Sequence, residues 1–206
     1  LNGMTRTITN EDDGEDNRPN RHPVDKKGVH RPEKLGNTNK GGNELYVVTW
    51  QDSPNILKEI RRLRETAYRM AGQVQAFLWI WTGSTQGQAL QVIGVWDPEA
   101  EAIIGGYRYI LGPDVRLKDD GQPDITSSHL FRYSDEFIKD YLPHTMELGR
   151  SYVTPEYQSS KAGAKSLFTM DNLWDGITSV ILGHPGIIWF FGKMTIYPSY
   201  NQTAEI

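Results

Sequence analysis

A glutamate and an arginine stand three residues apart in a stretch that otherwise has the composition of a buried strand. The stretch covers residues 145–154, TMELGRSYVT, and carries Glu147 and Arg150 among strand-forming side chains. An ionisable group buried in such a strand is destabilising unless it is paired or used. Two interpretations follow. Either Glu147 and Arg150 are used in a functional site, or the two belong to a buried structural ion pair.

The relative orientation of these two side chains depends on the regularity of the strand. Their offset is odd, so a regular strand would place Glu147 and Arg150 on opposite faces. A β-bulge near Gly149 would bring both side chains to one side. A shared site therefore requires a bulge there.

A loop of small residues follows the strand. Residues 158–164 are rich in Ser, Gly and Ala, and a helical pattern then covers residues 165–182. A strand, a small-residue loop and a helix N-terminus together form an anion cradle, because backbone N–H groups and the helix dipole point at the ligand. The sequence predicts a phosphate-binding site at this junction.

Three segments carry a resemblance to a known family. They are ELGRSYVTPEYQ at 147–158, LRETAYR at 63–69 and IIGGYRYILG at 103–112, supported by LWDGI at 173–177. Together they resemble the hemolysin-like branch of the GNAT acyltransferases, which includes the amino-acid N-acyltransferases of ornithine- and glycine-lipid synthesis. The acyl-homoserine-lactone synthases are cousins with a similar Glu-x-x-Arg. The resemblance runs from about residue 43 to residue 201.

The resemblance implies roles for eleven residues, in three groups. The catalytic residues would be Glu147 and Arg150. The substrate-binding residues would be Arg64, Tyr68 and Arg108. The donor-binding residues would be Tyr152, Val153, Gln158, Gly163, Ala164 and Lys165. The last loop departs from the usual GNAT spacing of Arg or Gln before Gly-x-Gly, which suits an acyl-carrier donor better than coenzyme A.

The implied reaction is acyl transfer from a phosphopantetheine thioester to a primary amine. The donor would be a 3-hydroxy fatty acyl group on acyl carrier protein, or an acyl-CoA, and the acceptor an amino acid such as ornithine or glycine. The pantetheine would hydrogen-bond along a strand edge as an added strand. No tightly bound cofactor is expected, and the sequence has no pattern of metal ligands.

Two other functions remain open from the sequence. One is a catalytically inactive GNAT-fold fragment or binding protein, because the acceptor-side segment is altered and the chain ends at Ile206, before the further strands of the fold. The other is an acyl-homoserine-lactone synthase. An acidic motif on the acceptor side would favour an enzyme over an inactive fragment or binding protein, since an ammonium substrate needs a neighbouring carboxylate.

The altered segment covers residues 72–87, where the family has Asp-x-Asp-x-Phe-Asp. This chain has Trp79 and Trp81 there. Trp has the single codon TGG, so in a frame shifted by two nucleotides a new triplet begins with the last base of each Trp codon. Its last two bases are the first two of the following Ile80 or Thr82 codon, and the triplet encodes Asp. The shifted frame can read Asp-Met-Asp-Gly-Phe-Asp. We hypothesise a local frameshift in the source DNA or its sequencing; the alternative is a hydrophobic strand or membrane-facing wedge.

Composition narrows the possible partners. The chain has 206 residues, a formal net charge of −4 and no cysteine. The net charge does not indicate nucleic acid binding, and the absence of cysteine excludes disulfides, thiolate metal sites and a Cys nucleophile. No apolar run is long enough to span a membrane, and no secretory signal is evident. We expect a cytoplasmic protein with possible peripheral contact at the inner membrane.

The elements that must position these residues follow an α/β order. Residues 1–43 are polar and predict a disordered tail, and residues 44–206 a GNAT-like domain, incomplete at its C-terminus. We expect a mixed central sheet flanked by helices. Its expected elements are strands at 44–50, 89–96, 101–111, 145–154 and 186–197, the last fully buried, a helix from Ser53-Pro54 onward, a short helix after Ser134, and a helix at 165–182.

Overall fold

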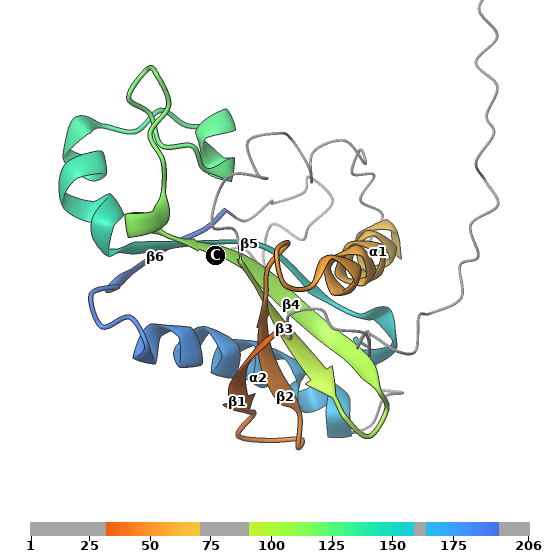
Figure 1. Ribbon diagram of the computed structural model, residues 1–206. Coiled ribbons are helices and arrows are strands. Elements are labelled where there is room, and N and C mark those ends of the chain that lie inside the picture. Colours follow the sequence, from red (N-terminus) through yellow and green to blue (C-terminus); the bar gives the residue numbers. More distant parts are fainter. Residues whose placement is uncertain (1–31, 71–90, 159–163, 194–206) are drawn as a thin grey trace, which may run out of the picture.

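The fold is one mixed sheet with a helix on each face (Figure 1). The computed structural model describes residues 32–70, 91–158 and 164–193. The sheet order is β1-β2-β3-β4-β5-β6, antiparallel up to β5, with β6 parallel to β5. The strands are β1 (Glu33–Asn37), β2 (Glu44–Val48), β3 (Gln91–Asp97), β4 (Ala102–Leu111), β5 (Thr145–Val153) and β6 (Trp189–Phe191).

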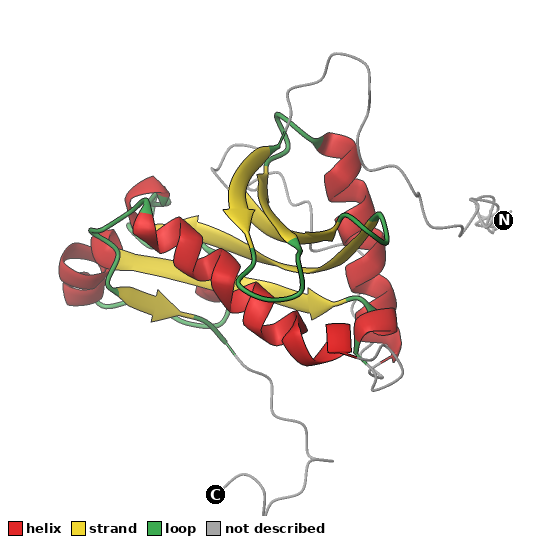
Figure 2. Ribbon diagram, turned by 90° about the horizontal axis from the view of Figure 1, so that it is seen from below, coloured by secondary structure: helices red, strands yellow, loops and turns green. Residues whose placement is uncertain are grey.

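The two long helices cover opposite faces of this sheet. Helix α1 (Pro54–Met70) buries Leu57, Ile60 and Ala67 against the sheet, where they pack with Ile103 of β4 and Tyr152 of β5. Helix α2 (Ala164–Leu182) lies across the other face, as the view from below shows (Figure 2). Both helices appear where the apolar periodicity predicted them.

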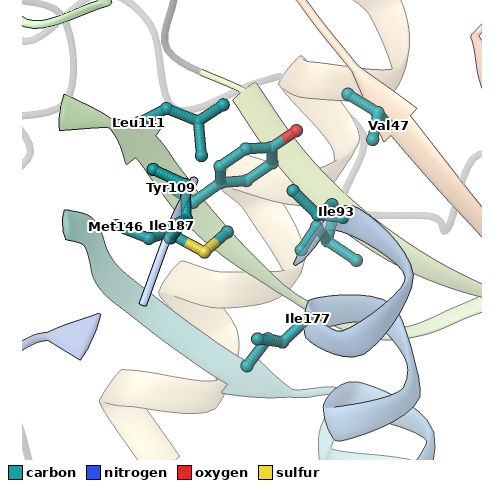
Figure 3. Packing of buried hydrophobic residues seen from close by; sticks show 8 residues of the cluster. Val47, Ile93, Tyr109, Leu111, Met146, Ile177 and Ile187 are labelled. Atoms are coloured by element: carbon teal, nitrogen blue, oxygen red, sulfur yellow. The ribbon is translucent and has the colours of Figure 1, made fainter. Parts of the chain in front are cut away.

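The core beneath α2 holds the strand that carries Glu147. Met146 is fully buried and packs with Ile93, Tyr109 and Ile177 (Figure 3). Burying each of these aliphatic side chains contributes roughly 1.5–3 kcal/mol. Since side chains alternate along a strand, anchoring Met146 beneath α2 turns Glu147 toward the face that α1 covers.

The sheet begins earlier than the sequence predicted. Strand β1 lies within the segment expected to be a polar tail, and its residues Glu33 and Lys34 pair with Val47 and Tyr46 of β2. The tail boundary at residue 43 was therefore wrong. An edge strand needs little apolar content because its outer side faces water, so EKLGN carries no strand signal.

The expected buried strand at 186–197 is the second difference. Strand β6 has only three residues, and Trp189 and Phe190 are about half exposed, at 49% and 50%. Its residues pair with β5 on one side only, because β6 is the last strand of the described sheet. An apolar run can thus form a sheet edge, and hydrophobicity alone does not distinguish the two positions.

The connection between β4 and β5 folds into short helical turns. The hydroxyl of Ser134 accepts a hydrogen bond from the N–H of Phe137 at 3.1 Å, which confirms the predicted cap. The turns after it are a π-helix at Phe137–Tyr141 and a 3-10 turn at Leu142–His144. Within the described ranges, no helix combines the length and apolar character that crossing a membrane requires.

Candidate functional site

Glu147 is held by the connection between β4 and β5. Its carboxylate accepts hydrogen bonds from the backbone N–H of Ser127 at 3.1 Å, from the Ser127 hydroxyl at 2.5 Å and from the N–H of Thr126 at 3.4 Å. Tyr133 in turn donates its hydroxyl proton to Ser127 Oγ at 2.6 Å. Hydrogen bonds to a carboxylate fix its orientation, so Glu147 presents a defined face to the α1 side of the sheet.

Aromatic packing keeps this loop in place. The Tyr133 ring stacks on Phe137 with 4.8 Å between centroids and meets Phe191 edge-on at 5.9 Å. Phe191 is the β6 residue that pairs with Glu147. The hydrogen-bond chain that ends at Glu147 is therefore anchored to the neighbouring strand as well as to its own loop.

The expected bulge is present in β5. Gly106 of β4 pairs with Tyr152 and Arg108 with Gly149, so β5 has one more residue than β4 over this interval. Arg150 lies in the extra segment and has φ 57°, a left-handed conformation that is strained for a residue with a side chain. The bulge breaks the simple alternation that would have sent Arg150 to the opposite face from Glu147.

Four basic residues act on one another electrostatically beside Glu147, and we call them the cationic cluster: Arg64, Arg108, Arg150 and Lys193. Burial, followed by the charge of Arg150, lowers the pKa of Arg108 to about 10, while Glu147 opposes the shift. Burial and the charge of Arg150 also lower the pKa of Lys193. Like charges that act on one another in this way favour the binding of an anion.

Arg64 and Tyr68 come from α1, one turn apart, and both reach this site. The Arg64 guanidinium lies 5.7 Å from the centre of the Tyr68 ring, and the Tyr68 hydroxyl donates to the carbonyl of Ser151 in the bulge at 3.0 Å. Burial, followed by the charge of Arg150, lowers the pKa of Arg64. The helix is thus tied to the bulge at the point where it delivers its arginine.

All five residues predicted for catalysis and acceptor binding are therefore near one another. Arg108 is also fixed, because its guanidinium donates to the Thr126 hydroxyl beside Glu147. The same loop thus contacts both the acid and one of the cations. Such an arrangement has the polarity to hold a zwitterion or a developing oxyanion in a site with little water.

The predicted donor-binding residues have mixed positions. Tyr152 is buried beneath α1, where its hydroxyl has no hydrogen-bond partner in the described part of the chain and burial raises its pKa. Val153 packs on the α2 side, and the exposed Gln158 donates through Nε2 to the Val153 carbonyl at 2.6 Å. Gly163 lies outside the described residues, while Ala164 and Lys165 begin α2.

One edge of β5 is left open beside the site. Strand β6 pairs with β5 only from Thr145 to Glu147. From Leu148 to Val153, the described structure has β4 on one side of β5 and no strand on the other. A strand edge with free N–H and C=O groups can accept an extended ligand through main-chain hydrogen bonds.

Sequence reasoning missed Ser127, Tyr133 and Lys193. Ser127 and Tyr133 belong to the loop at 112–133, which has no periodic pattern, and Lys193 follows β6. The segment FFGK at 190–193 offered one signal, a lysine directly after a glycine at the end of an apolar run. In the described residues, no group of three His, Asp or Glu side chains is placed to hold a metal ion.

Two aspartates of α2 bind the turn between β1 and β2. The Asp175 carboxylate accepts from the N–H and Nδ2 of Asn39 at 2.9 and 2.6 Å, and Asp171 lies 3.6 Å from Lys40. These contacts tie the β1–β2 turn to α2. The altered segment at 72–87 lies outside the described residues.

Comparison with known proteins agrees with this geometry. Residues 88–167 match the family described as acetyltransferase (GNAT) domain. A glycine N(alpha)-acyltransferase of Phocaeicola vulgatus is 48% identical over 184 residues, which cover 84% of this chain and 53% of the relative. One of Bacteroides thetaiotaomicron is 50% identical over 173 residues, covering 84% and 51%. The chain spans about half the length of these relatives. The fold and this match show that the chain contains an acetyltransferase (GNAT) domain.

Proposed function

We propose that the protein transfers a fatty acyl group from a thioester to the amine of glycine, forming an N-acylglycine lipid. The observation that carries the proposal is the meeting of Glu147 with the cationic cluster at the point where β5 loses its β6 partner. Nucleophile, thioester and oxyanion donors must converge at such a point. The name of the two relatives, glycine N(alpha)-acyltransferase, supports glycine as the acceptor.

The reaction forms one bond and breaks one. The neutral amine nitrogen attacks the thioester carbonyl carbon, and the tetrahedral intermediate carries an oxyanion. When it collapses, the C–S bond breaks and the amide forms. The proton lost by the amine is balanced by the proton that the leaving thiolate takes up.

Glu147 is our candidate for receiving or orienting the amine. Its oxygens already accept three hydrogen bonds from the loop, so the carboxylate is preorganised. Arg150, which lies in the bulge of β5, is our candidate for donating to the oxyanion. Arg108 of β4 attracts Glu147 and would also stabilise the charge of the oxyanion.

The donor is proposed to be a 3-hydroxyacyl group on acyl carrier protein. Its phosphopantetheine would pair with the open edge of Leu148–Val153, and its phosphate would lie at the N-terminus of α2 near Gly163, Ala164 and Lys165. An acyl-CoA would supply the same arm. Direct competition between the two thioesters distinguishes the donors.

The lipid product suggests contact with a membrane surface. The exposed Trp189 and Phe190 of β6 lie on the edge next to β5, and aromatic side chains favour the interface between water and lipid. We propose peripheral contact at this edge. Binding to liposomes that Trp189→Ser weakens would support it.

The test is acylation by the purified chain. The protein is incubated with 3-hydroxypalmitoyl acyl carrier protein and glycine, and N-acylglycine is measured by mass spectrometry. Glu147→Gln should lower kcat at least tenfold, whereas Glu136→Gln, at an exposed helix start, should not. An acyl-homoserine lactone as product, or donor binding without any product, would overturn the proposal in favour of a signal synthase or a binding protein.

A further inference from the structure

Arg64 is a buried cation without an anion. Its side chain is 7% exposed, and its Nε is buried with no hydrogen-bond partner. Within the described residues it forms no ion pair; its nearest aromatic contact is Tyr68. The attraction between a cation and an aromatic ring is weaker than the free-energy cost of removing a guanidinium from water. A charge kept under these conditions indicates a ligand that compensates it.

The charged groups around Arg64 do not supply that compensation. From its own helix, Glu65 acts on it, but the Glu65 carboxylate is bound by Arg69 at 2.7 Å. Arg150 of β5 repels Arg64. Tyr68 of α1 and Tyr152 of β5 also act on Arg64, but a phenol does not supply the charge of a carboxylate. Glu147 is held by its loop and lies among the other members of the cationic cluster.

We propose that Arg64 marks a subsite for the carboxylate of the acceptor, so that the site selects free α-amino acids over amines that lack a carboxylate. This inference rests on the proposed function. The carboxylate would face Arg64, with Arg150 beside it, and the amine of the same small molecule would face Glu147.

The arrangement also favours the reactive form of the amine. An ammonium bound among cations loses its proton more readily than one in water, because the positive charges disfavour a further positive charge. Binding through the carboxylate therefore delivers the neutral nucleophile that attack on a thioester requires. An amine without a carboxylate would have no anchor and would be repelled while protonated.

The experiment compares two acceptors and two arginines. kcat/KM is measured for glycine and for glycinamide with wild-type protein, Arg64→Met and Arg62→Met. Arg62 is the matched control, because it lies on the same helix and forms its ion pair with Glu59 at 2.7 Å. We expect Arg64→Met to reduce the preference for glycine by roughly 10- to 100-fold through KM, with glycinamide unaffected and Arg62→Met unchanged.

Direct binding separates this inference from the proposed function. Acetate, methylamine and glycine are titrated without donor and followed by calorimetry, so the result does not depend on turnover. Binding of acetate and glycine that Arg64→Met abolishes supports the subsite even if no acylation occurs. Equal loss for glycine and glycinamide, or acetate binding that survives Arg64→Met, overturns it and makes Arg64 a partner of another group of the chain. If Arg64→Met fails to fold, Arg64→Lys serves instead: it should retain acetate binding at reduced affinity, and unaltered affinity in that variant would contradict the inference.

Discussion

Ser127 holds the carboxylate of Glu147 with two hydrogen bonds, one from its backbone N–H at 3.1 Å and one from its hydroxyl at 2.5 Å. The loop that contributes Ser127 lies twenty residues earlier in the chain, so the geometry of the proposed acid depends on a segment outside the strand that carries it. Tyr133 completes the arrangement by donating to the Ser127 hydroxyl.

Ser127→Ala should weaken turnover more than substrate binding. The substitution removes the hydroxyl donor but keeps the N–H, so Glu147 stays near its place with more freedom. We expect kcat to fall about tenfold, which corresponds to about 1.4 kcal/mol and lies near the lower end of the range for one hydrogen bond to a charged group, while KM for the donor changes little. Tyr133→Phe keeps the ring stack on Phe137 and should show a smaller effect. Equal kcat in wild type and Ser127→Ala would remove this role.

Arg108→Met should stabilise the fold while abolishing activity. Burial, followed by the charge of Arg150, lowers the pKa of Arg108 from its ordinary value to about 10. The unfolded chain therefore binds more protons between that pH and the ordinary pKa of arginine, and the free energy of unfolding rises with pH across that window. Below it the destabilisation is fully present, so at pH 7 the variant should gain about 1–3 kcal/mol and several degrees in Tm.

The control for that experiment is Arg62→Met, which removes a cation that already has a partner in Glu59. Its stability should change by less than about 1 kcal/mol, and it should not rise. Thermal unfolding at pH 7 provides the comparison. A lower Tm for Arg108→Met would mean that the bond to Thr126 and the attraction of Glu147 outweigh burial.

Arg150→Gly and Arg150→Ala should differ in stability although both remove the guanidinium. Glycine accepts φ 57° without strain, whereas alanine keeps the strain. We expect the glycine variant to be about 1 kcal/mol more stable than the alanine variant in urea denaturation. Both should lose activity. Identical stabilities would show that the bulge relaxes when the side chain is removed.

The coding DNA tests the hypothesis about Trp79 and Trp81. We expect sequencing across residues 70–95 to reveal a missing or added base, and the restored frame to encode Asp-x-Asp-x-Phe-Asp. The frame-restored protein should then acylate glycine faster than the chain with the two tryptophans, because an ammonium acceptor gains carboxylate neighbours. Confirmed tryptophan codons with no acidic reading in another frame would reject the hypothesis.

Much of the fold could be predicted because local signals agreed with it. The pair Ser53-Pro54 predicted the start of α1, and two β-rich stretches joined by a turn predicted β3 and β4. The bulge at Arg150 followed from asking how an acid and a base with an odd offset could share a site. These features depend on neighbouring residues, which a sequence displays directly.

The rest depends on contacts between distant segments. Ser127 and Lys193 join Glu147 through loop geometry and strand pairing that leave no periodic trace. Strand β1 is a polar edge strand and β6 is an apolar one, so hydrophobicity predicted no strand for the first and a buried strand for the second. Leu167 and Trp174 of α2 are apolar but exposed at 75% and 55%, so hydrophobicity alone does not identify the buried side of that helix either.

The open edge of Leu148–Val153 has a consequence for handling the protein. A strand edge that no described strand pairs with is a template for pairing with another chain, so a second copy could bind where a pantetheine arm would. Donor and self-association should therefore compete. The thioester that serves as substrate would then also act as a solubilising ligand, keeping concentrated protein monomeric where the empty form aggregates.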